Sequence, residues 1–398
     1  MPERVVFVCA TYLPRITGVA TALHAWTRQL NRLGTRVTVV APDYPPFPFY
    51  PPPVYPDGLE VVRLPSRPAP LVQGIQTAQA RGADWDALLA SLRGQRALVH
   101  GQDVLLAGCI ALKIGRACRL PVVLHGHYPL GDGDPSDWLP FTMGRTGRRA
   151  LNSLVSRTAE RKARSVCRGA DVVAVVSSYV QELFQRRRVA DPIIVPCGIE
   201  VPAQAPEIGI RSRHGIPAGA PLFLYVGRMD PDKLVGQLLE SVAHMRKTEP
   251  RVRLLLVGGG PYLSRYVEKA AALRLGDAAV FAGWVPYRDV WAYYEQSDLF
   301  IIASPYEAQG LVVIEAQAGG LPVVGYRGGG VSLAVAEGRT GVLTDHTPEA
   351  LAQAAIALWQ DKARLQAMRA ATRQQVAVYS IEQQFPVLLD AYARAMAR

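Results

Sequence analysis

The stretch "DLFIIASPYEAQGLVVIEAQAGGLPVVGY", residues 298–326, reads as a buried strand, a turn, a short helix and a second buried strand. Its strands are continuous runs of Leu, Ile, Val and Phe, as in a parallel sheet that helices cover on both faces. Two carboxylates, Glu307 and Glu315, stand in it with seven residues between them, among apolar and small residues. Buried carboxylates are costly without partners of matching chemistry, so the stretch predicts a binding site as well as a fold.

The same rhythm of strands and helices fills both halves of the chain. It begins with "VVFVCA" (5–10), a helix and "RVTVVAP" (36–42), and it restarts at "PLFLYVG" (221–227). The first helix is expected to carry one apolar face, formed by Val19, Leu23, Trp26, Leu30 and Leu33. A segment rich in Pro and Gly, 196–209, separates the halves. We therefore predict an α/β protein with two doubly wound Rossmann-like domains whose parallel sheets face a cleft, residues 1–198 and 199–379, and a last helix at about 380–398 that packs back on the first domain.

Composition narrows the compartment and the class of protein. Of the 398 residues 49% are hydrophobic, yet no apolar run approaches the eighteen residues of a membrane-spanning helix. The apolar run after Arg4 is too short for a signal peptide. The five cysteines are odd in number and scattered, which favours reduced thiols in the cytoplasm over disulfides or a zinc site: Cys9, Cys109, Cys118, Cys167 and Cys197.

Positive charge is concentrated in the first half. Residues 1–200 hold 24 Lys and Arg against 15 Asp and Glu, a net charge of +9, whereas the remainder has a net charge of +2. Much of the excess lies in 144–169, a basic helix that follows the apolar segment "DWLPFTM" (137–143). Such a helix fits an anionic membrane surface, although a solvated helix that serves solubility remains the alternative. The predicted membrane-binding residues are Arg145, Arg148, Arg149, Arg157, Arg161 and Lys162. The Pro- and Tyr-rich loop 43–58 is either a further lipid contact or a rigid surface loop.

Four glycine-rich turns follow expected strands, around Gly18, at 258–260, at Gly310 and at 325–332. Free N–H groups at such strand-to-helix turns favour phosphate, and four of them are stronger evidence than any one. Arg228 and Lys233 stand just past a strand end, where they fit a diphosphate. The alternative is that they pair with Asp230 and Asp232 of the same loop. No metal or other cofactor is predicted beyond a nucleotide-sugar donor.

The motifs "VGRMDPDK", "LLLVGGGP", "VFAGWVP", "SPYEAQGLVVIEAQAGGLPVV" and "GRTGVL" resemble the retaining glycosyltransferases of family 4, which have the GT-B fold. The resemblance implies that Glu315 binds the ribose and that Glu307 lies beside the transferred sugar. It also implies diphosphate binding by Arg228 and Lys233, catalytic participation of His125 near the sugar, and backbone contacts to the donor around Val285, Gln309, Gly310 and Leu311. For His125 the alternative is a core histidine, and for the two glutamates it is an exposed position on an amphipathic helix.

Two positions resemble the branch that glycosylates diacylglycerol. Gln309 precedes Gly310 as in the "ETQG" typical of that branch, and "TYLPRITGVAT" (11–21) is similar to its "YLP...SGV". The implied function is transfer of a hexose, as UDP-glucose or UDP-galactose, to diacylglycerol by an enzyme peripheral on the inner face of the cell membrane. The alternatives are another lipid acceptor, such as an inositol phospholipid, a soluble acceptor, a nucleotide-sugar epimerase, or a non-catalytic protein that binds nucleotide sugars. Nucleic-acid binding is disfavoured because aromatic residues do not interleave with the basic run.

Overall fold

The computed structural model describes residues 1–44, 54–68, 76–130 and 145–398, and within 145–155 only the backbone. The described chain divides into two compact units. Unit 1 runs from Met1 to Gly198 and includes Ile381–Arg398, and unit 2 consists of Ile199–Ser380. The linker expected at 196–209 therefore contains the boundary between them.

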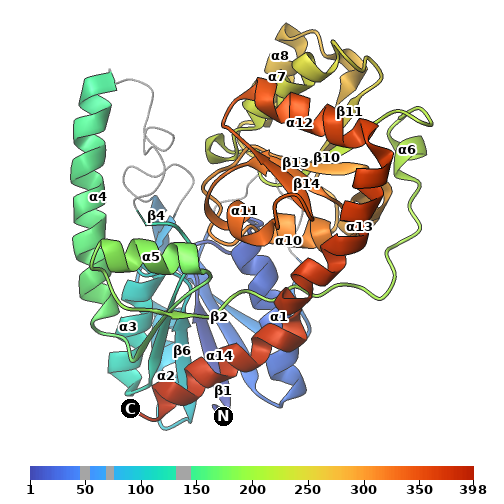
Figure 1. Cartoon of the computed structure of the whole chain (residues 1–398). Helices are drawn as coiled ribbons and strands as arrows, with labels where there is room; N and C mark the ends of the chain where they lie inside the picture. Colours follow the sequence, from blue (N-terminus) through green and yellow to red (C-terminus); the bar gives the residue numbers. More distant parts are fainter. Residues whose placement is uncertain (45–53, 69–75, 131–144) are drawn as a thin grey trace. The chain divides into compact units, whose positions relative to one another are not determined.

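Unit 1 is built around a seven-stranded sheet in the order β3-β2-β1-β6-β7-β8-β9 (Figure 1). All neighbouring strands of this sheet are parallel, and a short antiparallel pair, β4 and β5, lies outside it. Its elements are β1 (Arg4–Val8), α1 (Gly18–Arg32), β2 (Arg36–Pro42), β3 (Leu59–Leu64), β4 (Ser66–Pro68), β5 (Gln76–Ala78), α2 (Ala83–Leu92), β6 (Ala97–Gly101), α3 (Leu106–Cys118), β7 (Val122–Gly126), α4 (Arg145–Cys167), β8 (Val172–Val175), α5 (Ser178–Arg186), β9 (Ile193–Ile194) and α14 (Ile381–Met396).

Helix α1 shows how the apolar pattern becomes packing. Thr17 caps its N-terminus, with the hydroxyl accepting a hydrogen bond from the Ala20 N–H, and the helix buries Leu23, Trp26 and Leu30. The expectation for Leu33 is wrong. It follows the helix as the C-cap residue and is 56% exposed, because the chain leaves the helix there for the turn at Gly34.

Helix α14 belongs to unit 1 although unit 2 precedes it in the chain. It packs against α1, β7 and β8, and Figure 1 shows it in red among the blue and green elements of that unit. The Tyr392 hydroxyl on α14 forms a 2.9 Å hydrogen bond with Nδ1 of His100 on β6. The last helix thus closes one face of the unit 1 sheet.

Unit 2 contains a six-stranded parallel sheet in the order β12-β11-β10-β13-β14-β15. The two sheets confirm the predicted α/β class with parallel sheets. The elements of unit 2 are α6 (Ile210–Arg213), β10 (Leu222–Val226), the 3-10 helix η2 (Pro231–Lys233), α7 (Val235–Met245), β11 (Arg253–Val257), α8 (Leu263–Ala272), η3 (Gly276–Ala278), β12 (Ala279–Gly283), α9 (Tyr287–Gln296), β13 (Leu299–Ile302), α10 (Leu311–Ala318), β14 (Val323–Tyr326), α11 (Gly329–Ala334), β15 (Gly341–Thr344), α12 (Pro348–Gln360), α13 (Lys362–Val376) and η4 (Ala377–Tyr379).

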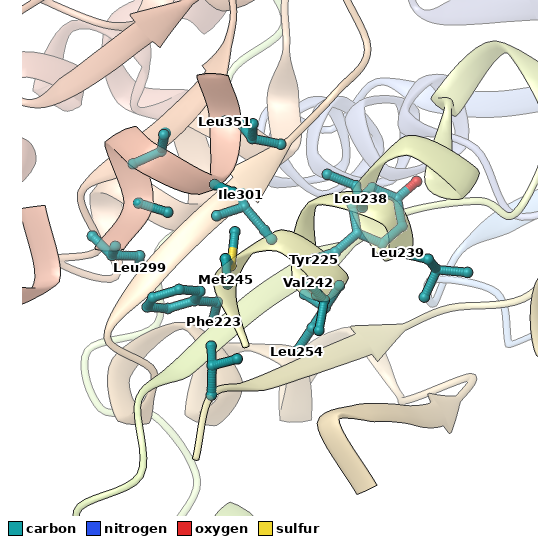
Figure 2. Close-up of a cluster of buried hydrophobic side chains, with 14 of the residues drawn as sticks. Phe223, Tyr225, Leu238, Leu239, Val242, Met245, Leu254, Leu299, Ile301 and Leu351 are labelled. Atoms are coloured by element: carbon teal, nitrogen blue, oxygen red, sulfur yellow. The ribbon is translucent and has the colours of Figure 1, made fainter. Parts of the chain in front are cut away.

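The central strands of unit 2 are buried on both faces, as their continuous apolar sequences require. On β10, Phe223 and Tyr225 join one core, while Leu222 and Leu224 join the core on the opposite face. Figure 2 shows the first of these cores, in which α7 packs its apolar side on the sheet. Each large side chain buried in this way contributes about 1.5–3 kcal/mol.

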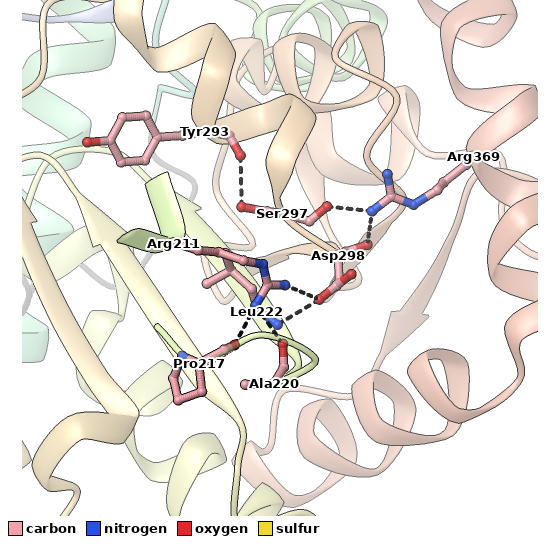
Figure 3. A network of polar contacts seen from close by, with 8 residues as sticks. All are labelled: Arg211, Pro217, Ala220, Leu222, Tyr293, Ser297, Asp298 and Arg369. Atoms are coloured by element: carbon pink, nitrogen blue, oxygen red, sulfur yellow. Dashed lines mark hydrogen bonds and ion pairs between the residues drawn. The ribbon is translucent and has the colours of Figure 1, made fainter. Parts of the chain in front are cut away.

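A polar network fixes the amino ends of β10 and β13 (Figure 3). The Asp298 carboxylate accepts hydrogen bonds from the Leu222 N–H (2.8 Å) and from Arg211 (3.3 Å). Arg369 of α13 donates to the carbonyls of Ser297 and Asp298. The network anchors the two central strands at one edge, so the opposite edge, where their carboxyl ends lie, holds its loops on a rigid support.

Candidate active site

The strand order of unit 2 brings two distant loops together. Strands β10 and β13 are neighbours, and the chain progresses outward in opposite directions from this pair. In open parallel sheets ligands bind beside the carboxyl ends at such a switch point. Arg228 and Lys233 follow β10, and Glu307 follows β13, so the topology explains why residues 74 positions apart in sequence meet.

The cations of the first loop are paired with carboxylates of both loops. Lys233 Nζ lies 2.7 Å from Glu307 Oε1 and 3.3 Å from Asp232 Oδ2. Arg228 forms an ion pair with Asp230 and lies 3.6 Å from Asp232 Oδ2. The interpretation that Arg228 and Lys233 pair with their own loop is therefore correct for this structure, and the contact of Lys233 with Glu307 adds a partner that loop-internal pairing does not supply.

Both members of the pair Lys233 and Asp232 are held in their charged forms. Burial alone would lower the pKa of Lys233, but the Glu307 and Asp232 carboxylates outweigh it and raise that pKa. Burial likewise would raise the pKa of Asp232, but Lys233 and Arg228 outweigh it and lower that pKa. Because the two cations are already held in place, they can meet an entering anion with little reorganisation.

Two buried tyrosines hold the backbone of the cationic loop. The Tyr225 hydroxyl, at the end of β10, donates a 2.8 Å hydrogen bond to the Arg228 carbonyl. The Tyr266 hydroxyl of α8 donates to the Asp230 carbonyl at 3.2 Å. The loop that carries Arg228 is thus held in place by the hydroxyls of Tyr225 and Tyr266, which lie outside the sequence motif.

Glycines shape the turn between the two conspicuous glutamates. Gly310 caps α10 with φ of 76°, in the left-handed region that favours glycine. Gly330 packs on the same turn: its N–H donates to the Glu307 carbonyl at 2.5 Å, and a Cβ on it would lie 2.5 Å from the Gln309 carbonyl carbon. The first N–H groups of α10, including that of Leu311, have no intrahelical acceptors, so the turn presents donors with the helix dipole behind them.

Glu315 lies on the second turn of α10, only 5% exposed, so the interpretation as a surface glutamate is wrong. Its carboxylate accepts 2.9 Å hydrogen bonds from the hydroxyls of Tyr287 and Tyr294, two turns apart on α9. Burial raises the pKa of Glu315 to about 7, although both hydrogen bonds favour the ionised form. The side chain is therefore a buried acceptor whose protonation changes near neutral pH.

In unit 1, the side chain of His125 lies in the core. It is completely buried near the end of β7, with its ring stacked on His100 (5.5 Å between centroids) and on Trp26 (5.6 Å). Burial lowers its pKa to about 3, partly opposed by the backbone of Val195. Three residues on, Tyr128 is 44% exposed. The structure therefore surrounds His125 with rings and leaves Tyr128 as the exposed aromatic of that loop.

The turn that leads to Gly18 is fixed by an arginine from the edge of the unit 1 sheet. Arg63 on β3 donates to the carbonyls of Leu13 (2.5 Å) and Pro42 (3.1 Å) and to the Tyr55 hydroxyl (3.1 Å). Gly18 itself is exposed as the first residue of α1. The start of α1 is therefore exposed beside a turn that Arg63 anchors.

Comparison with known families agrees with this architecture. A profile described as "Glycosyltransferase Family 4" matches residues 16–201, and one described as "Glycosyl transferases group 1" matches 208–375. Together these profiles account for most of both units. The chain belongs to the family 4 glycosyltransferases.

Two curated relatives of this glycosyltransferase are named for lipid acceptors, whereas others are D-inositol 3-phosphate glycosyltransferases, such as that of Nocardia farcinica, which is 29% identical and covers 85% of this chain and 74% of the relative. This chain is 27% identical over 326 residues to the alpha-monoglucosyldiacylglycerol synthase of Streptococcus pneumoniae, covering 79% of this chain and 69% of the relative. It is also 27% identical to a GDP-mannose-dependent alpha-(1-6)-phosphatidylinositol monomannoside mannosyltransferase of Mycolicibacterium smegmatis, covering 90% of each chain.

Solved structures show the same fold for this glycosyltransferase. Anabaena HepE in complex with UDP-glucose superposes with a TM-score of 0.75 at 18% identity, covering 98% of this chain and 99% of that chain. The pneumococcal O-GlcNAc transferase GtfA, in complex with UDP and GlcNAc, superposes with a TM-score of 0.71 at 13% identity over the whole of both chains. The GT-B fold expected from the motifs is therefore confirmed.

The basic helix α4 of this glycosyltransferase presents part of the predicted membrane-binding set to solvent. Arg157, Arg161 and Lys162 are exposed, whereas Glu160 is paired with Arg187. The side chains of Arg145, Arg148 and Arg149 lie outside the described residues, as do the segment 137–143 and residues 45–53 of the Pro- and Tyr-rich loop. No helix among the described residues has the length and apolar character needed to cross a bilayer.

Sequence reasoning missed the partners of the predicted residues. Tyr287 and Tyr294, which contact Glu315, carry a usable signal because a spacing of seven places both on one face of a helix. Trp284, the neighbour of Val285, packs its indole against Gly259, where an added Cβ would lie 2.5 Å from Nε1. Tyr225 carried no signal, since an apolar strand with one tyrosine is common in buried sheets.

Proposed function

We propose that the chain is a retaining hexosyltransferase that moves a hexose from a UDP-sugar, UDP-glucose or UDP-galactose, to diacylglycerol. The observation that carries the proposal is the ion pair between Lys233 and Glu307 beside the N-terminus of α10. That arrangement puts a cation, a carboxylate and helix N–H donors at one switch point. The similarity to alpha-monoglucosyldiacylglycerol synthase supports the choice of acceptor.

Each donor-binding residue receives a part that its chemistry suits. Arg228, Lys233 and the N–H groups of Gly310 and Leu311 bind the diphosphate, as fixed cations and helix-start donors do. Glu315 accepts hydrogen bonds from the ribose hydroxyls. The backbone at Val285 meets the base, and Gln309 contributes to the sugar and phosphate side of the turn.

Transfer then proceeds with retained configuration by attack on the face from which the diphosphate leaves. The acceptor oxygen bonds to the anomeric carbon as the bond from that carbon to the diphosphate oxygen breaks. The leaving phosphate oxygen takes the acceptor proton, and the cations stabilise the charge that develops there. Glu307 is proposed to orient the sugar being moved.

In unit 1, we propose that His125 acts mainly by holding a loop in place, and that it does not change its protonation state. A histidine whose pKa is about 3 stays neutral at physiological pH, so His125 would polarise or position a group without taking a proton. Its ring supports the loop that carries His127 and Tyr128, where the sugar is expected. The exposed turn at Gly18 is proposed to approach the donor phosphates.

We also propose that the enzyme is cytoplasmic and docks reversibly on the anionic inner face of the cell membrane. The exposed Arg157, Arg161 and Lys162 support this part, because each cation near such a surface is worth about 1 kcal/mol.

Sedimentation of the enzyme with vesicles containing phosphatidylglycerol should be strong at low salt and weak at high salt. Replacing Arg157, Arg161 and Lys162 with Gln should weaken vesicle binding by roughly 100-fold. The matched control replaces three exposed cations of unit 2 with Gln and should leave vesicle binding unchanged: Lys247, Arg251 and Arg265. If as much enzyme sedimented with neutral vesicles as with anionic ones, electrostatic docking would be contradicted.

A second candidate is an inositol phospholipid acceptor with a GDP-mannose donor. It is favoured by the mannosyltransferase relative that covers 90% of each chain. Incubation with UDP-glucose, UDP-galactose or GDP-mannose, each with vesicles of diacylglycerol or phosphatidylinositol, separates the two candidates by product mass. A hexosyl diacylglycerol supports the first, and a mannosylated phosphatidylinositol supports the second. Release of nucleoside diphosphate without glycolipid would mean that the sugar passes to water, which would count against both lipid acceptors.

A further inference from the structure

The side chains around the proposed diphosphate site include more carboxylates than cations. Two cations, Arg228 and Lys233, are surrounded by three carboxylates within ion-pair distance: Asp230, Asp232 and Glu307. All five side chains are largely buried, with exposures between 8% and 19%. The cluster therefore carries a net negative charge before a diphosphate adds more.

Asp232 differs from the other two carboxylates in its contacts. Its Oδ2 atom lies 3.3 Å from Lys233 Nζ and 3.6 Å from Arg228 Nη2, so one oxygen faces both cations. Asp230 forms its ion pair with Arg228, and Glu307 forms its ion pair with Lys233. The low pKa of Asp232 keeps its charge at neutral pH. Asp232 is thus the carboxylate placed to compete with a diphosphate for both cations at once.

This inference rests on the proposed function. We propose that Asp232 weakens the binding of the nucleoside diphosphate, so that the product leaves after the sugar has been transferred. A diphosphate held by Arg228 and Lys233 would lie close to the Asp232 carboxylate and be repelled by it. Tight product binding slows many transferases, since product release often limits turnover. The negative charge of Asp232 beside the two cations offsets part of their attraction for the diphosphate.

A purely structural part for Asp232 predicts the opposite result. If the carboxylate served to orient the two cations, removing its charge would leave them misplaced and diphosphate binding would weaken. If it competes with the ligand, removing its charge frees both cations and binding strengthens. The sign of the change therefore separates the two roles.

The test is calorimetric titration of the full-length protein with UDP and with GDP. Asp232→Asn, which keeps the size of the side chain, should lower the Kd by about tenfold for whichever nucleotide binds. Asp232→Glu, which keeps the charge, should remain close to the wild-type Kd. Asp277→Asn is the matched control, because it breaks an Asp–Arg ion pair with Arg253 at the amino end of β11 in the same unit.

Each outcome decides the inference. An Asp232→Asn protein with the same or a weaker affinity than wild type overturns it, as does an equal gain in Asp277→Asn. If Asp232→Asn does not fold, Asp232→Ser replaces it with the same expected sign. A wild-type protein that binds UDP or GDP keeps the proposed donor site whatever the variants do. A wild-type protein that binds neither overturns the donor site and this inference together.

Discussion

Lys233 is the residue through which the two loops of the unit 2 switch point touch. Replacing it with Ala should lower kcat/KM by at least about 100-fold, because a fixed donor at a developing negative charge is worth that much. The free energy of unfolding should fall by about 3 kcal/mol, because the replacement leaves the largely buried Glu307 carboxylate without its ion-pair partner. Steady-state kinetics and urea unfolding measure the two effects.

The matched control for Lys233→Ala is Lys247→Ala, which truncates an exposed lysine of the same unit. It should leave both quantities unchanged. Wild-type turnover in a well-folded Lys233→Ala protein would remove Lys233 from the proposed mechanism.

Glu315 should make nucleotide binding depend on pH near neutrality. Its pKa in the folded chain is about 7, so the carboxylate form predominates above that pH and is lost as the pH falls below it. The ionised form is the better acceptor for ribose hydroxyls. UDP affinity should therefore fall by up to about tenfold between pH 8 and pH 6, beyond the change seen in Glu315→Gln. Parallel pH profiles for the two proteins would contradict the role of Glu315.

At the residue scale, the sequence was informative about which residues matter, but it revealed only those partners that lie in the same loop. Glu307, Glu315, Arg228 and Lys233 stood out because charges are rare in an otherwise apolar stretch or just past a strand end. The pairing of both cations with Asp232 was weighed from the sequence because the residues share one loop. The contacts with Tyr225 and Tyr287 depend on loop geometry and side-chain direction, which motif spacing does not encode. For His125 a core position was weighed as the alternative and is what the structure shows, but the rings that enclose it come from distant parts of the chain and were not predictable.

Strand β7 and its neighbours enclose a stack of histidines that should make unit 1 sensitive to acid. Burial lowers the pKa values of His100, His125 and His127 below that of an unfolded histidine. The unfolded chain therefore binds more protons, and stability is lost as the pH falls below about 6.5 towards the folded pKa values. From His125 alone the loss should reach roughly 3 kcal/mol at pH 4.5, because its folded pKa is about 3.

Urea unfolding at pH 7.5 and pH 4.5, followed by amide hydrogen exchange of unit 1, measures this loss. His125→Phe keeps a ring in the stack and should flatten the pH dependence. His346→Gln, at an exposed position of unit 2, should not alter it. An equally steep dependence in His125→Phe would exclude His125 as its source.

Elements with strong patterns were predictable, and weak ones were not. Long apolar strands such as β10 and β13 and the amphipathic helix α1 follow directly from their sequences. Strand β15, Gly341–Thr344, gave no clear pattern because it has four residues and begins with glycine. Its place at the sheet edge is set by pairing with β14, which is a tertiary effect.

At the scale of the whole molecule, α14 ties the end of the described chain to unit 1. Deleting 381–398 should destabilise unit 1 by several kcal/mol, because it uncovers one face of the sheet and removes the Tyr392 bond to His100. Unit 2 should keep its fold, since it is one continuous segment, Ile199–Ser380. Hydrogen exchange resolved by unit measures both effects. Equal loss of protection in the two units would show that their folding is coupled.

The order of synthesis follows from this arrangement. Unit 1 leaves the ribosome before unit 2, but the helix that closes it is made after all of unit 2. Until then the surface around His100, which Tyr392 later covers, stays open while a second sheet folds. A nascent chain therefore carries an exposed apolar patch for the time needed to translate unit 2, and that interval is when chaperones would have most reason to bind it.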